Sequence, residues 1–252
     1  SAGDDRLLYN GDRVDGGDGQ DTVLLRPDDN LTGADLGKLF NVEVIDLSGG
    51  AHQVAGLSQA AVLGMTGAGQ TLTVQGDADD SVSLVGGWSS TDGVTYTSGT
   101  ATFVNAGGGA KVAIEGTGGA DTLHYSGHET QVDGGVGTDT LMLVGDTLGL
   151  GDADFSKLKG IERIDLTQGD HTITGLDPKD VLDISGDSKQ LMILGDTNDS
   201  VQLAKVNGVG FTMASGANAT ETIGGHTFDV YTSAYNISLK LLIENTIQVD
   251  NN

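Results

Sequence analysis

Hydrophobic and polar residues alternate along this chain in short runs, and Gly-rich turns separate the runs. Segments 42–47 and 161–166 are examples, and an alternation of period two is typical of a strand that buries one face. Runs with a long helical period are almost absent. The pattern predicts an all-β chain with short helical turns at residues 30–40 and after Asp177, where an Asp-Pro pair is typical of a helix start.

These runs belong to two copies of one longer pattern. Residues 14–25 match residues 132–143 at eight of twelve positions, at an offset of 118. Residues 72–84 match residues 191–203 at seven of thirteen positions, at an offset of 119. Such constant offsets predict two tandem repeat units, the first at 1–117 and the second at 118–252.

The most specific motif of each repeat is Gly-Gly-x-Gly-x-Asp-x-apolar-x, the nonapeptide of calcium-binding β-rolls. Its glycines let the backbone turn tightly and direct carbonyl oxygens inward, and its Asp adds a carboxylate to those oxygens. The ligand positions that this predicts are Gly16, Gly19 and Asp21 in the first repeat, and Gly134, Gly137 and Asp139 in the second. An ordinary Gly-rich hairpin turn is the alternative interpretation.

Each nonapeptide follows a less regular copy of itself, which contributes Asp5 in the first repeat and Asp121 in the second. The spacing from Asp121 to Asp139 equals two nonapeptides, and two nonapeptides make one full coil of a β-roll. We therefore expect their loops to stack, with calcium between them. Asp5 and Asp21 are slightly closer together in the sequence and need a shorter coil.

A second repeated motif has the form strand, Gly-Asp-x-x-Asp turn, strand. Its acids are Asp77 and Asp80 in the first repeat, and Asp196 and Asp199 in the second. Each pair could bracket a calcium ion, or each Asp could cap its own backbone in an Asx-turn. Asp46 and Asp165, in the strand runs, are either further ligands or acids that face solvent.

Two all-β architectures fit these patterns. Short runs at coil-length spacing predict a parallel, solenoid-like stack in which successive coils share one core. The hairpin-like segments 94–115 and 228–244 favour the alternative of two antiparallel β-sandwich-like units. We expect the calcium-stabilised stack.

Charge and composition narrow the possible partners. The 36 acids and 12 Lys and Arg residues give a net charge of -24, which repels nucleic acid and anionic membranes. Because 37% of the residues are hydrophobic, we expect a folded chain whose charge attracts cations, and not a disordered one. Cysteine is absent, and no apolar run is long enough to span a bilayer. We expect a soluble, extracellular piece of a longer chain.

The order of the motifs resembles the repeats of giant RTX-type adhesins of Gram-negative bacteria. The resemblance rests on the nonapeptide, then Ile-Asp-Leu, then Gly-Asp-x-x-Asp-x-Val-x-Leu, and in the first repeat Gly86-Gly87-Trp88. It implies an extracellular calcium-binding segment of a cell-surface adhesin that is exported by type I secretion and builds biofilms. Its neighbours would be other domains of the same long chain. The chain departs from RTX arrays in having one strict nonapeptide per repeat.

Other functions have weaker support in the sequence. A glycan or peptide could bind through calcium or through Trp88 with Tyr96. His128-Glu129 begins like a zinc-protease helix, but Val132 stands where the second His is required. Because nucleophile and phosphate-loop motifs are missing too, we expect no enzyme, although a glycosidase-like acid pair stays open. The five histidines are expected on the surface or in strands and not as ligands; they are His52, His124, His128, His171 and His226.

Overall fold

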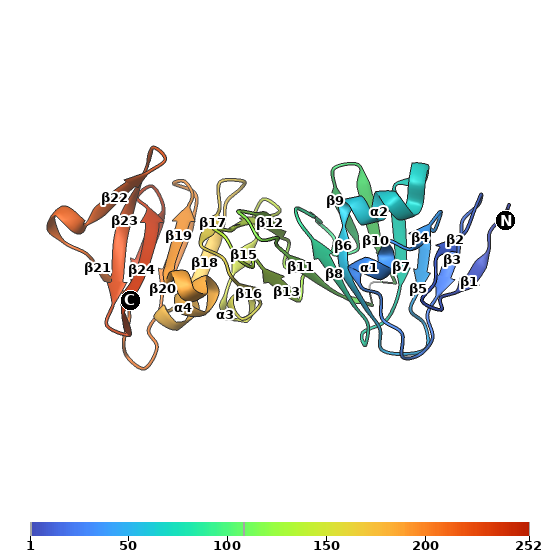
Figure 1. The fold of residues 1–252 in the computed structure, drawn as a ribbon. Helices are drawn as coiled ribbons and strands as arrows, with labels where there is room; N and C mark the ends of the chain where they lie inside the picture. The colour runs from blue at the N-terminus through green and yellow to red at the C-terminus, as the bar shows by residue number, and fades with distance from the viewer. Residues whose placement is uncertain (1, 108, 252) are drawn as a thin grey trace. The chain divides into compact units, whose positions relative to one another are not determined.

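The computed structural model describes residues 2–107 and 109–251 and consists mainly of β-strands, as predicted (Figure 1). The chain forms two compact units. One is Ser1–Glu115 together with His128–Thr130, and the other is Gly116–Gly127 together with Gln131–Asn252. The short segment His128–Thr130 thus belongs to the first unit although it follows the repeat boundary, which the sequence pattern does not indicate.

The described residues of the first unit form eleven strands, two short helices and one 3-10 turn. In chain order these are β1 Arg6–Leu8, β2 Val14–Asp15, β3 Thr22–Leu24, α1 Gly33–Leu36, β4 Leu39–Phe40, β5 Val44–Asp46, β6 Gln53–Ser58, α2 Gln59–Thr66, η1 Gly67–Gly69, β7 Thr71–Gln75, β8 Ser81–Val85, β9 Thr95–Ser98, β10 Ala101–Ala106 and β11 Lys111–Glu115.

Successive strands of this unit pass alternately between two sides. One side is the sheet β1-β3-β5-β7-β10-β9, in which only β9 is antiparallel to its neighbour. The other side holds the parallel pair β2–β4 and the parallel strands β6–β8–β11. The register Arg6↔Thr22 between β1 and β3 shows that the shorter coil from Asp5 to Asp21 closes.

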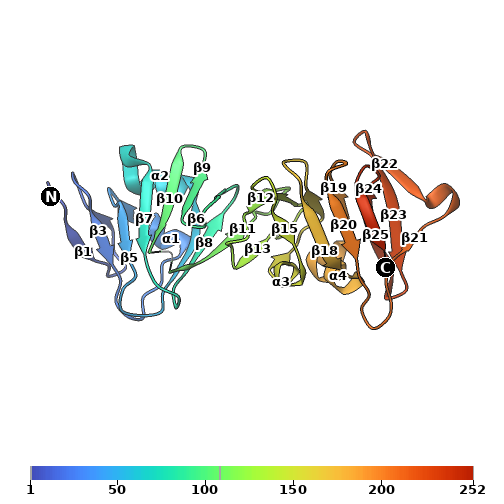
Figure 2. The same ribbon diagram turned by 180° about the vertical axis from the view of Figure 1, so that it is seen from behind.

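The second unit repeats this plan (Figures 1 and 2). Its elements are β12 Thr122–Tyr125, β13 Gln131–Asp133, β14 Thr140–Leu143, β15 Gly149–Leu150, α3 Asp152–Phe155, β16 Leu158–Lys159, β17 Arg163–Asp165, β18 Thr172–Leu176, α4 Pro178–Ser185, η2 Gly186–Ser188, β19 Gln190–Leu194, β20 Ser200–Leu203, β21 Thr212–Met213, η3 Gly216–Asn218, β22 Thr220–Ile223, β23 His226–Ser233, β24 Asn236–Glu244 and β25 Gln248–Asn251.

Here too most neighbouring strands are parallel. The sheet β12-β14-β17-β19-β24 is parallel throughout, and β23, β21 and β22 extend it in antiparallel fashion. The strands β15-β18-β20-β25 form a parallel sheet of their own, and β13 pairs with β16. The register Thr122↔Thr140 confirms that the loops of Asp121 and Asp139 are stacked one coil apart.

The sheets are therefore mixed. Parallel strand pairs form most of each unit, and antiparallel pairs occur at β9–β10 and β23–β24, where hairpins were expected. The strands are short because each coil needs only a few residues to cross the core. Apolar residues recur at the same register from coil to coil, so each coil buries its inward face against the next.

One inward-facing column in each unit shows how the core is built. In parallel strands, residues in register point to the same side, so they stack into columns. The column of the second unit is wholly apolar and buried: Leu123, Leu141, Ile164, Ile193, Ile243. The matching column of the first unit is Leu7, Val23, Ile45, Val74, Asn105, and thus ends in an amide.

The helix after Asp177 begins as the sequence predicts. Asp177 is the N-cap of α4 and accepts hydrogen bonds from the backbone N–H groups of Lys179 and Asp180, and Pro178 occupies the first turn. Ser58 caps the matching helix α2 through a hydrogen bond from the N–H of Ala61. Both helices are eight residues long, and within the described residues no helix has the length and hydropathy to cross a membrane.

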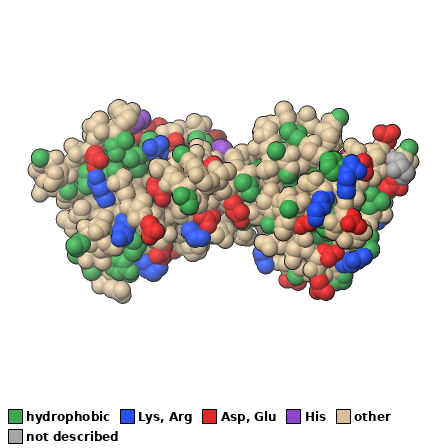
Figure 3. Space-filling model, in the orientation of Figure 1, with side chains coloured by type: hydrophobic (Ala, Val, Ile, Leu, Met, Phe, Trp, Pro, Cys, Tyr) green, Lys and Arg blue, Asp and Glu red, His purple; other side chains and the backbone are tan. Residues whose placement is uncertain are grey.

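The charge of the surface is only partly neutralised. On the face drawn in Figure 3, acidic side chains lie among fewer basic ones, and many Lys and Arg side chains lie beside an acid. Such neighbours include the ion pairs Arg6–Asp46 and Lys159–Asp133, at 2.8 Å and 2.7 Å. Because acids outnumber Lys and Arg by 36 to 12, most carboxylates keep no such partner.

Candidate metal centre

Each repeat has a glycine loop, residues 16–21 or residues 134–139, that lies between two neighbouring turns of the chain. Gly137 adopts a φ of +155°, and a Cβ there would lie 2.1 Å from the carbonyl oxygen of Gly119 in the preceding turn. No side chain fits at that distance. Glycine is required because the backbones of the two turns are in contact.

The following turn approaches the loop as closely. A Cβ on Gly134 would lie 2.0 Å from the carbonyl oxygen of Gly160, and a Cβ on Gly16 would lie 2.1 Å from that of Asn41. Gly19 is similarly close to the backbone of Gly3. All four predicted glycines therefore lie where backbone carbonyl groups converge on the loop.

Asp139 ends the second loop and is fully buried. Its Oδ1 accepts a hydrogen bond of 2.8 Å from the N–H of Asp121, and its own N–H donates one of 2.9 Å to Oε2 of Glu162. Its Oδ2 is buried and has no hydrogen-bond partner. Burial, more than any other cause, raises the pKa of the Asp139 carboxyl above its ordinary value of 3.8.

Asp21 has the same environment in the first loop. It is fully buried, its Oδ1 accepts a 2.8 Å hydrogen bond from the N–H of Asp5, and its N–H donates to Oε2 of Glu43 at 2.9 Å. Its Oδ2 also lacks a partner. The same buried, half-satisfied carboxylate thus occurs at the same place in both repeats.

The unpartnered oxygen of Asp139 and a backbone carbonyl of the following turn both lie near Gly134. Asp139 Oδ2 and the carbonyl oxygen of Gly160 lie 2.9 Å and 2.0 Å from the point where Gly134 would carry a Cβ. Neither oxygen has a proton to donate when the carboxyl is ionised. A buried carboxylate oxygen without a partner is costly unless a donor, a proton on the carboxyl or a cation offsets its charge.

The oxygen donors around each glycine loop are of the kinds that calcium binds. Calcium binds six to eight oxygens from carboxylates, backbone carbonyls and water, and does not need three acidic side chains. Asp139 Oδ2, the Gly160 carbonyl and the Glu162 carboxylate supply such oxygens, and the first repeat matches them with Asp21, Asn41 and Glu43. No cluster of three or more His, Asp or Glu side chains suited to a metal occurs among residues 2–107 and 109–251, so the oxygens of the backbone carry much of the argument.

Sequence reasoning missed the glutamates Glu43 and Glu162. They lie beside the loops through their hydrogen bonds to Asp21 and Asp139, and burial raises the pKa of the Glu162 carboxyl. Both lie in the repeated strand motif whose other acids, Asp46 and Asp165, are the ligand candidates that the sequence suggests. The Oδ1 of Asp165 instead accepts hydrogen bonds from the backbone and the hydroxyl of Thr167.

The two upstream acids contact the glycine loops through their backbone N–H groups. The carboxylate of Asp121 accepts hydrogen bonds from the backbone N–H and the hydroxyl of Thr117, at 2.7 Å and 2.9 Å for Oδ2. The backbone N–H groups of Asp5 and Asp121 are the groups that hold the buried aspartates of the loops. The Asp121 carboxylate therefore bonds within its own turn and not to the Asp139 loop.

The Gly-Asp-x-x-Asp turns have the geometry of the Asx-turn alternative. Asp80 is buried, and its two oxygens accept hydrogen bonds from the N–H groups of His52 and Asp77, both at 2.8 Å. Asp77 accepts one from the N–H of Asp79. The carboxylate of Asp80 joins two turns through backbone amides.

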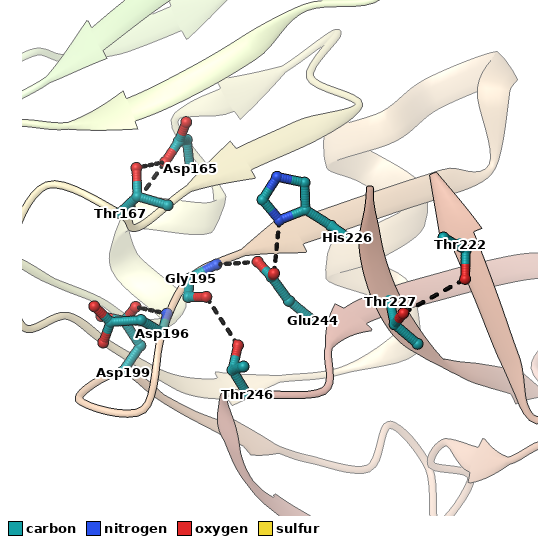
Figure 4. A network of polar contacts seen from close by, with 10 residues as sticks. All are labelled: Asp165, Thr167, Gly195, Asp196, Asp199, Thr222, His226, Thr227, Glu244 and Thr246. Atoms are coloured by element: carbon teal, nitrogen blue, oxygen red, sulfur yellow. Dashed lines mark hydrogen bonds and ion pairs between the residues drawn. The ribbon is translucent and has the colours of Figure 1, made fainter. Parts of the chain in front are cut away.

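The second repeat has the same arrangement, and Figure 4 draws its bond between Asp199 and the backbone of Asp196. Asp199 accepts hydrogen bonds from the N–H groups of His171 and Asp196 at 2.8 Å and 2.7 Å, and Asp196 accepts one from Asn198. Since both oxygens of Asp199 are engaged, these turns are weaker metal candidates than the glycine loops.

A glutamate of the last coil is joined to the same turn (Figure 4). Glu244 is largely buried, accepts a hydrogen bond from the N–H of Gly195 at 3.1 Å and lies 2.7 Å from Nδ1 of His226. The hydroxyl of Thr246 donates to the carbonyl of Gly195 at 3.0 Å. The network fixes the end of β19 against β24.

Two of the histidines are core residues. His52 and His171 are buried, and Nδ1 of each lies within hydrogen-bond distance of a backbone carbonyl, that of Asp29 or Leu148. Their Nε2 atoms have no partner. The expectation of a surface or strand position is wrong for these two, because the imidazole fills the space beneath the preceding turn.

The expected ligand-binding role of Trp88 and Tyr96 is corrected by the structure. Both side chains are fully buried, and Tyr96 packs on Phe103 with ring centroids 5.8 Å apart. Burial and the nearby Glu129 carboxylate raise the pKa of the Tyr96 hydroxyl. A sugar or peptide cannot stack on rings that are closed off from solvent, so these two aromatics belong to the core.

A Tyr-Asp-Lys cluster occurs in both repeats and was not anticipated. The hydroxyl of Tyr125 donates to Oδ1 of Asp154 at 2.5 Å, and Lys157 lies 2.9 Å from that hydroxyl. In the first repeat Tyr9, Asp35 and Lys38 make the matching Tyr–Asp and Lys–Asp contacts, at 2.8 Å and 2.9 Å. In each cluster a tyrosine at the end of a sheet strand, β1 or β12, donates a hydrogen bond to an aspartate of a short helix, α1 or α3.

We expect Tyr125→Phe to lower the free energy of unfolding by about 1–3 kcal/mol, because Asp154 then loses a buried donor. Tyr9→Phe should have a similar effect in the first repeat. Urea denaturation of both variants measures this. The exposed Tyr235, changed to Phe, is the control, and equal stability of Tyr125→Phe and this control would contradict the prediction.

The N-terminus of α4 gathers three carboxylates, those of Asp152, Asp177 and Asp180. Burial first, and then the charges of Asp177 and Asp152, raise the pKa of Asp180 to about 6. A carboxyl whose folded-state pKa is raised favours the folded state when protonated. The stability that the protonated Asp180 carboxyl contributes is therefore lost as the pH rises from its unfolded-state pKa near 3.8 through its folded-state pKa of about 6.

Asp180→Asn is expected to raise the melting temperature at pH 8 and to leave it nearly unchanged below pH 4. The amide keeps an acceptor for the N–H of Asp177 and removes the buried charge. Melting curves across this pH range, compared with Asp183→Asn on the same helix, are the measurement. Asp183 is exposed and paired with Lys179. A pH-independent effect of Asp180→Asn would show that its charge is not the cause.

Comparisons with known proteins give no relative for this chain: no family model, no curated protein and no solved structure matches it.

Proposed function

We propose that the chain is a calcium-binding structural segment of a large bacterial surface adhesin. The observation that carries the proposal is the buried, unpartnered Oδ2 of Asp139 and of its counterpart Asp21, in loops that backbone carbonyl groups approach closely. Calcium would supply positive charge to these inward-facing oxygens. The ligand set that we propose is Asp139, Gly160 and Glu162, with Asp21, Asn41 and Glu43 in the first repeat.

The winding of the chain supports a role in folding and spacing. Parallel strands at coil-length registers, with glycine loops between them, are the features of a calcium-stabilised β-roll. We propose such a roll-like stack for the parallel part of each unit. The antiparallel strands β9 and β21 to β23 then close the roll. A rigid repeat of this kind is suited to extending a long chain from a cell surface.

The charge of -24 supports an extracellular location. Extracellular calcium sites bind with dissociation constants of about 10⁻⁴ to 10⁻³ M, so the calcium concentration of a cytosol leaves them empty. Charge repulsion then keeps the chain loosely folded until it meets millimolar calcium outside the cell. We propose that this couples folding to export.

The proposal is tested by thermal melts of the whole chain, first in EDTA and then in millimolar calcium. A calcium-dependent rise in melting temperature supports it. Equal melting temperatures in the two solutions would exclude a calcium-stabilised segment.

A further inference from the structure

Strand β25 is an open edge of the second unit. It is the last strand of the sheet β15-β18-β20-β25, and no strand of residues 2–107 and 109–251 pairs with its outer side. The N–H of Gln248 donates to the carbonyl of Asp199 on the β20 side. Because backbone groups of successive strand residues point to opposite sides, the N–H and C=O of Val249 point outward. The strand has no Pro or Lys, which commonly block pairing at an edge.

The corresponding strand of the first unit, β11, has an occupied outer edge. The two strands correspond because Lys111 and Gln248, their first residues, pair with the first residues of the repeated strands β8 and β20. The carbonyl of Val112, the counterpart of Val249, accepts hydrogen bonds from the N–H and the hydroxyl of Thr130, at 2.8 Å and 3.0 Å. Val112 is also buried, whereas Val249 is partly exposed. The first unit thus shows that this edge can receive a further segment of chain.

Strand β2 is an open edge of the first unit. Its strand partner is β4, and the described residues contain no strand that pairs with its other side. The N–H of Val14 donates to the carbonyl of Lys38 on the β4 side. The backbone N–H and C=O groups of Arg13 and Asp15 therefore point toward the open side.

The corresponding strand of the second unit, β13, has a partner on this side. The carbonyl of Asp133, the counterpart of Asp15, accepts a hydrogen bond of 2.7 Å from the N–H of Gly116. Val132 is fully buried, whereas its counterpart Val14 is partly exposed. Both open edges of the chain therefore have a repeated counterpart in which backbone groups of another segment fill the same position.

The two open edges are complementary in direction and in charge. The bond from Gly116 to Asp133 defines a parallel register, and the same register between β25 and β2 of two chains places Arg13 opposite Asp250. Asp250 is exposed, and the Arg13 side chain is 60% exposed. Opposite charges on directly opposed strand residues stabilise a strand pair. This complementarity favours a second copy of the chain as the occupant of either edge.

We propose that β25 of one chain pairs in parallel with β2 of a second copy, so that copies associate head to tail. The contact is heterologous, because it joins two different edges, and each added copy leaves one β2 and one β25 open. The paired strands are short, so the dissociation constant is about 0.1–1 mM. Where such segments follow one another in one chain, effective concentrations in the millimolar range would fill the contact. The proposal does not depend on calcium binding at the glycine loops.

Single cysteines test the contact directly, because the chain has none of its own. Whole chains that carry Arg13→Cys are mixed with chains that carry Asp250→Cys, at fixed calcium in a glutathione redox buffer. Opposed residues of paired strands are close enough to form a disulfide. Mass spectrometry should show the mixed disulfide well above the ratio that random collision gives. Ser238→Cys, at an exposed position of β24, replaces Asp250→Cys as the control and should give only the random ratio.

Sedimentation equilibrium of the whole chain measures the strength of the contact without a cross-link. Val249→Pro removes an outward N–H and no bond to β20, so it should weaken association about tenfold and leave the melting temperature near that of the parent. Arg13→Asp and Asp250→Arg should each weaken association about fivefold, because like charges then oppose one another. The double variant restores opposite charges and should recover the parent's affinity, which a loss of folding would not do.

Three results would overturn the proposal. The first is a chain that stays monomeric at concentrations of about 1 mM. The second is a mixed disulfide between Arg13→Cys and Asp250→Cys at no more than the random ratio. The third is association that neither Val249→Pro nor the charge reversals change, which would assign it to another surface. Because calcium is constant throughout, none of these results bears on the calcium proposal.

Discussion

Calcium at about 10 mM is expected to raise the melting temperature of the EDTA-treated chain by about 10 °C. A ligand that binds only the folded state stabilises it by RT ln(1 + [L]/Kd). With extracellular dissociation constants, that amounts to about 1.4–2.7 kcal/mol for each site. Two equivalent sites, one in each repeat, together give about 3–5 kcal/mol. For a chain of this length each kcal/mol shifts the melting temperature by about 2–4 °C.

The comparison must separate calcium binding from general charge screening, because the chain carries a charge of -24. Sodium chloride at matched ionic strength screens that charge but does not fill a site. Magnesium is the second control, since it demands octahedral geometry and keeps several of its waters. We expect calcium to raise the melting temperature more than either sodium chloride or magnesium does. A rise of the same size with sodium chloride or magnesium would mean that no specific calcium site exists.

Asp139→Asn is expected to have opposite effects in the two solutions. In EDTA the variant should melt about 2–4 °C above the parent, since it removes a buried carboxylate whose Oδ2 has no hydrogen-bond partner. Burial raises the pKa of Asp139, so the ionised carboxylate costs stability as pH rises above 3.8. In calcium the same variant should melt below the parent, because one site has lost its charged ligand.

Two matched variants show whether the effect belongs to the glycine loops. Asp21→Asn should reduce the calcium-dependent rise by the same amount as Asp139→Asn, because its carboxylate has the same partners in the first repeat. Asp165→Asn should leave that rise unchanged, since Asp165 bonds to Thr167 within its own turn. Calorimetric titration of the three variants with calcium gives the affinities. Equal affinities in all three would mean that the proposed ligands are wrong.

The sequence determined the repeat, the strand class and the loops where carbonyl groups converge. Period-two alternation depends only on which residues are apolar, and recurring motifs at offsets of 118 and 119 need no structure to be seen. The glycines at 134 and 137 could also be predicted, because nothing larger fits between turns in backbone contact. The stacking of the Asp121 and Asp139 loops follows from their spacing alone.

The partners of individual side chains were decided by the tertiary structure. An Asp in a turn has the same local sequence whether it caps a backbone, as Asp80 does, or keeps a free buried oxygen, as Asp139 does. The difference depends on which neighbouring coil presents an N–H and which presents a carbonyl. Glu162 was missed for that reason, because its contact with Asp139 joins two different coils.

Burial of large polar or aromatic residues also depended on the fold. Trp88 and Tyr96 could be a binding platform or core from their sequence alone, and the packing of β9 and β10 placed them inside. Asn105 is a polar residue in a core position. The alternation of its strand predicts an apolar residue at that register, but the chain has a buried amide there. The sequence determines which faces of the strands are apolar, because that is a property of each residue. Which atoms meet across the coils depends on register and on the turns between them, and only the assembled structure sets those distances.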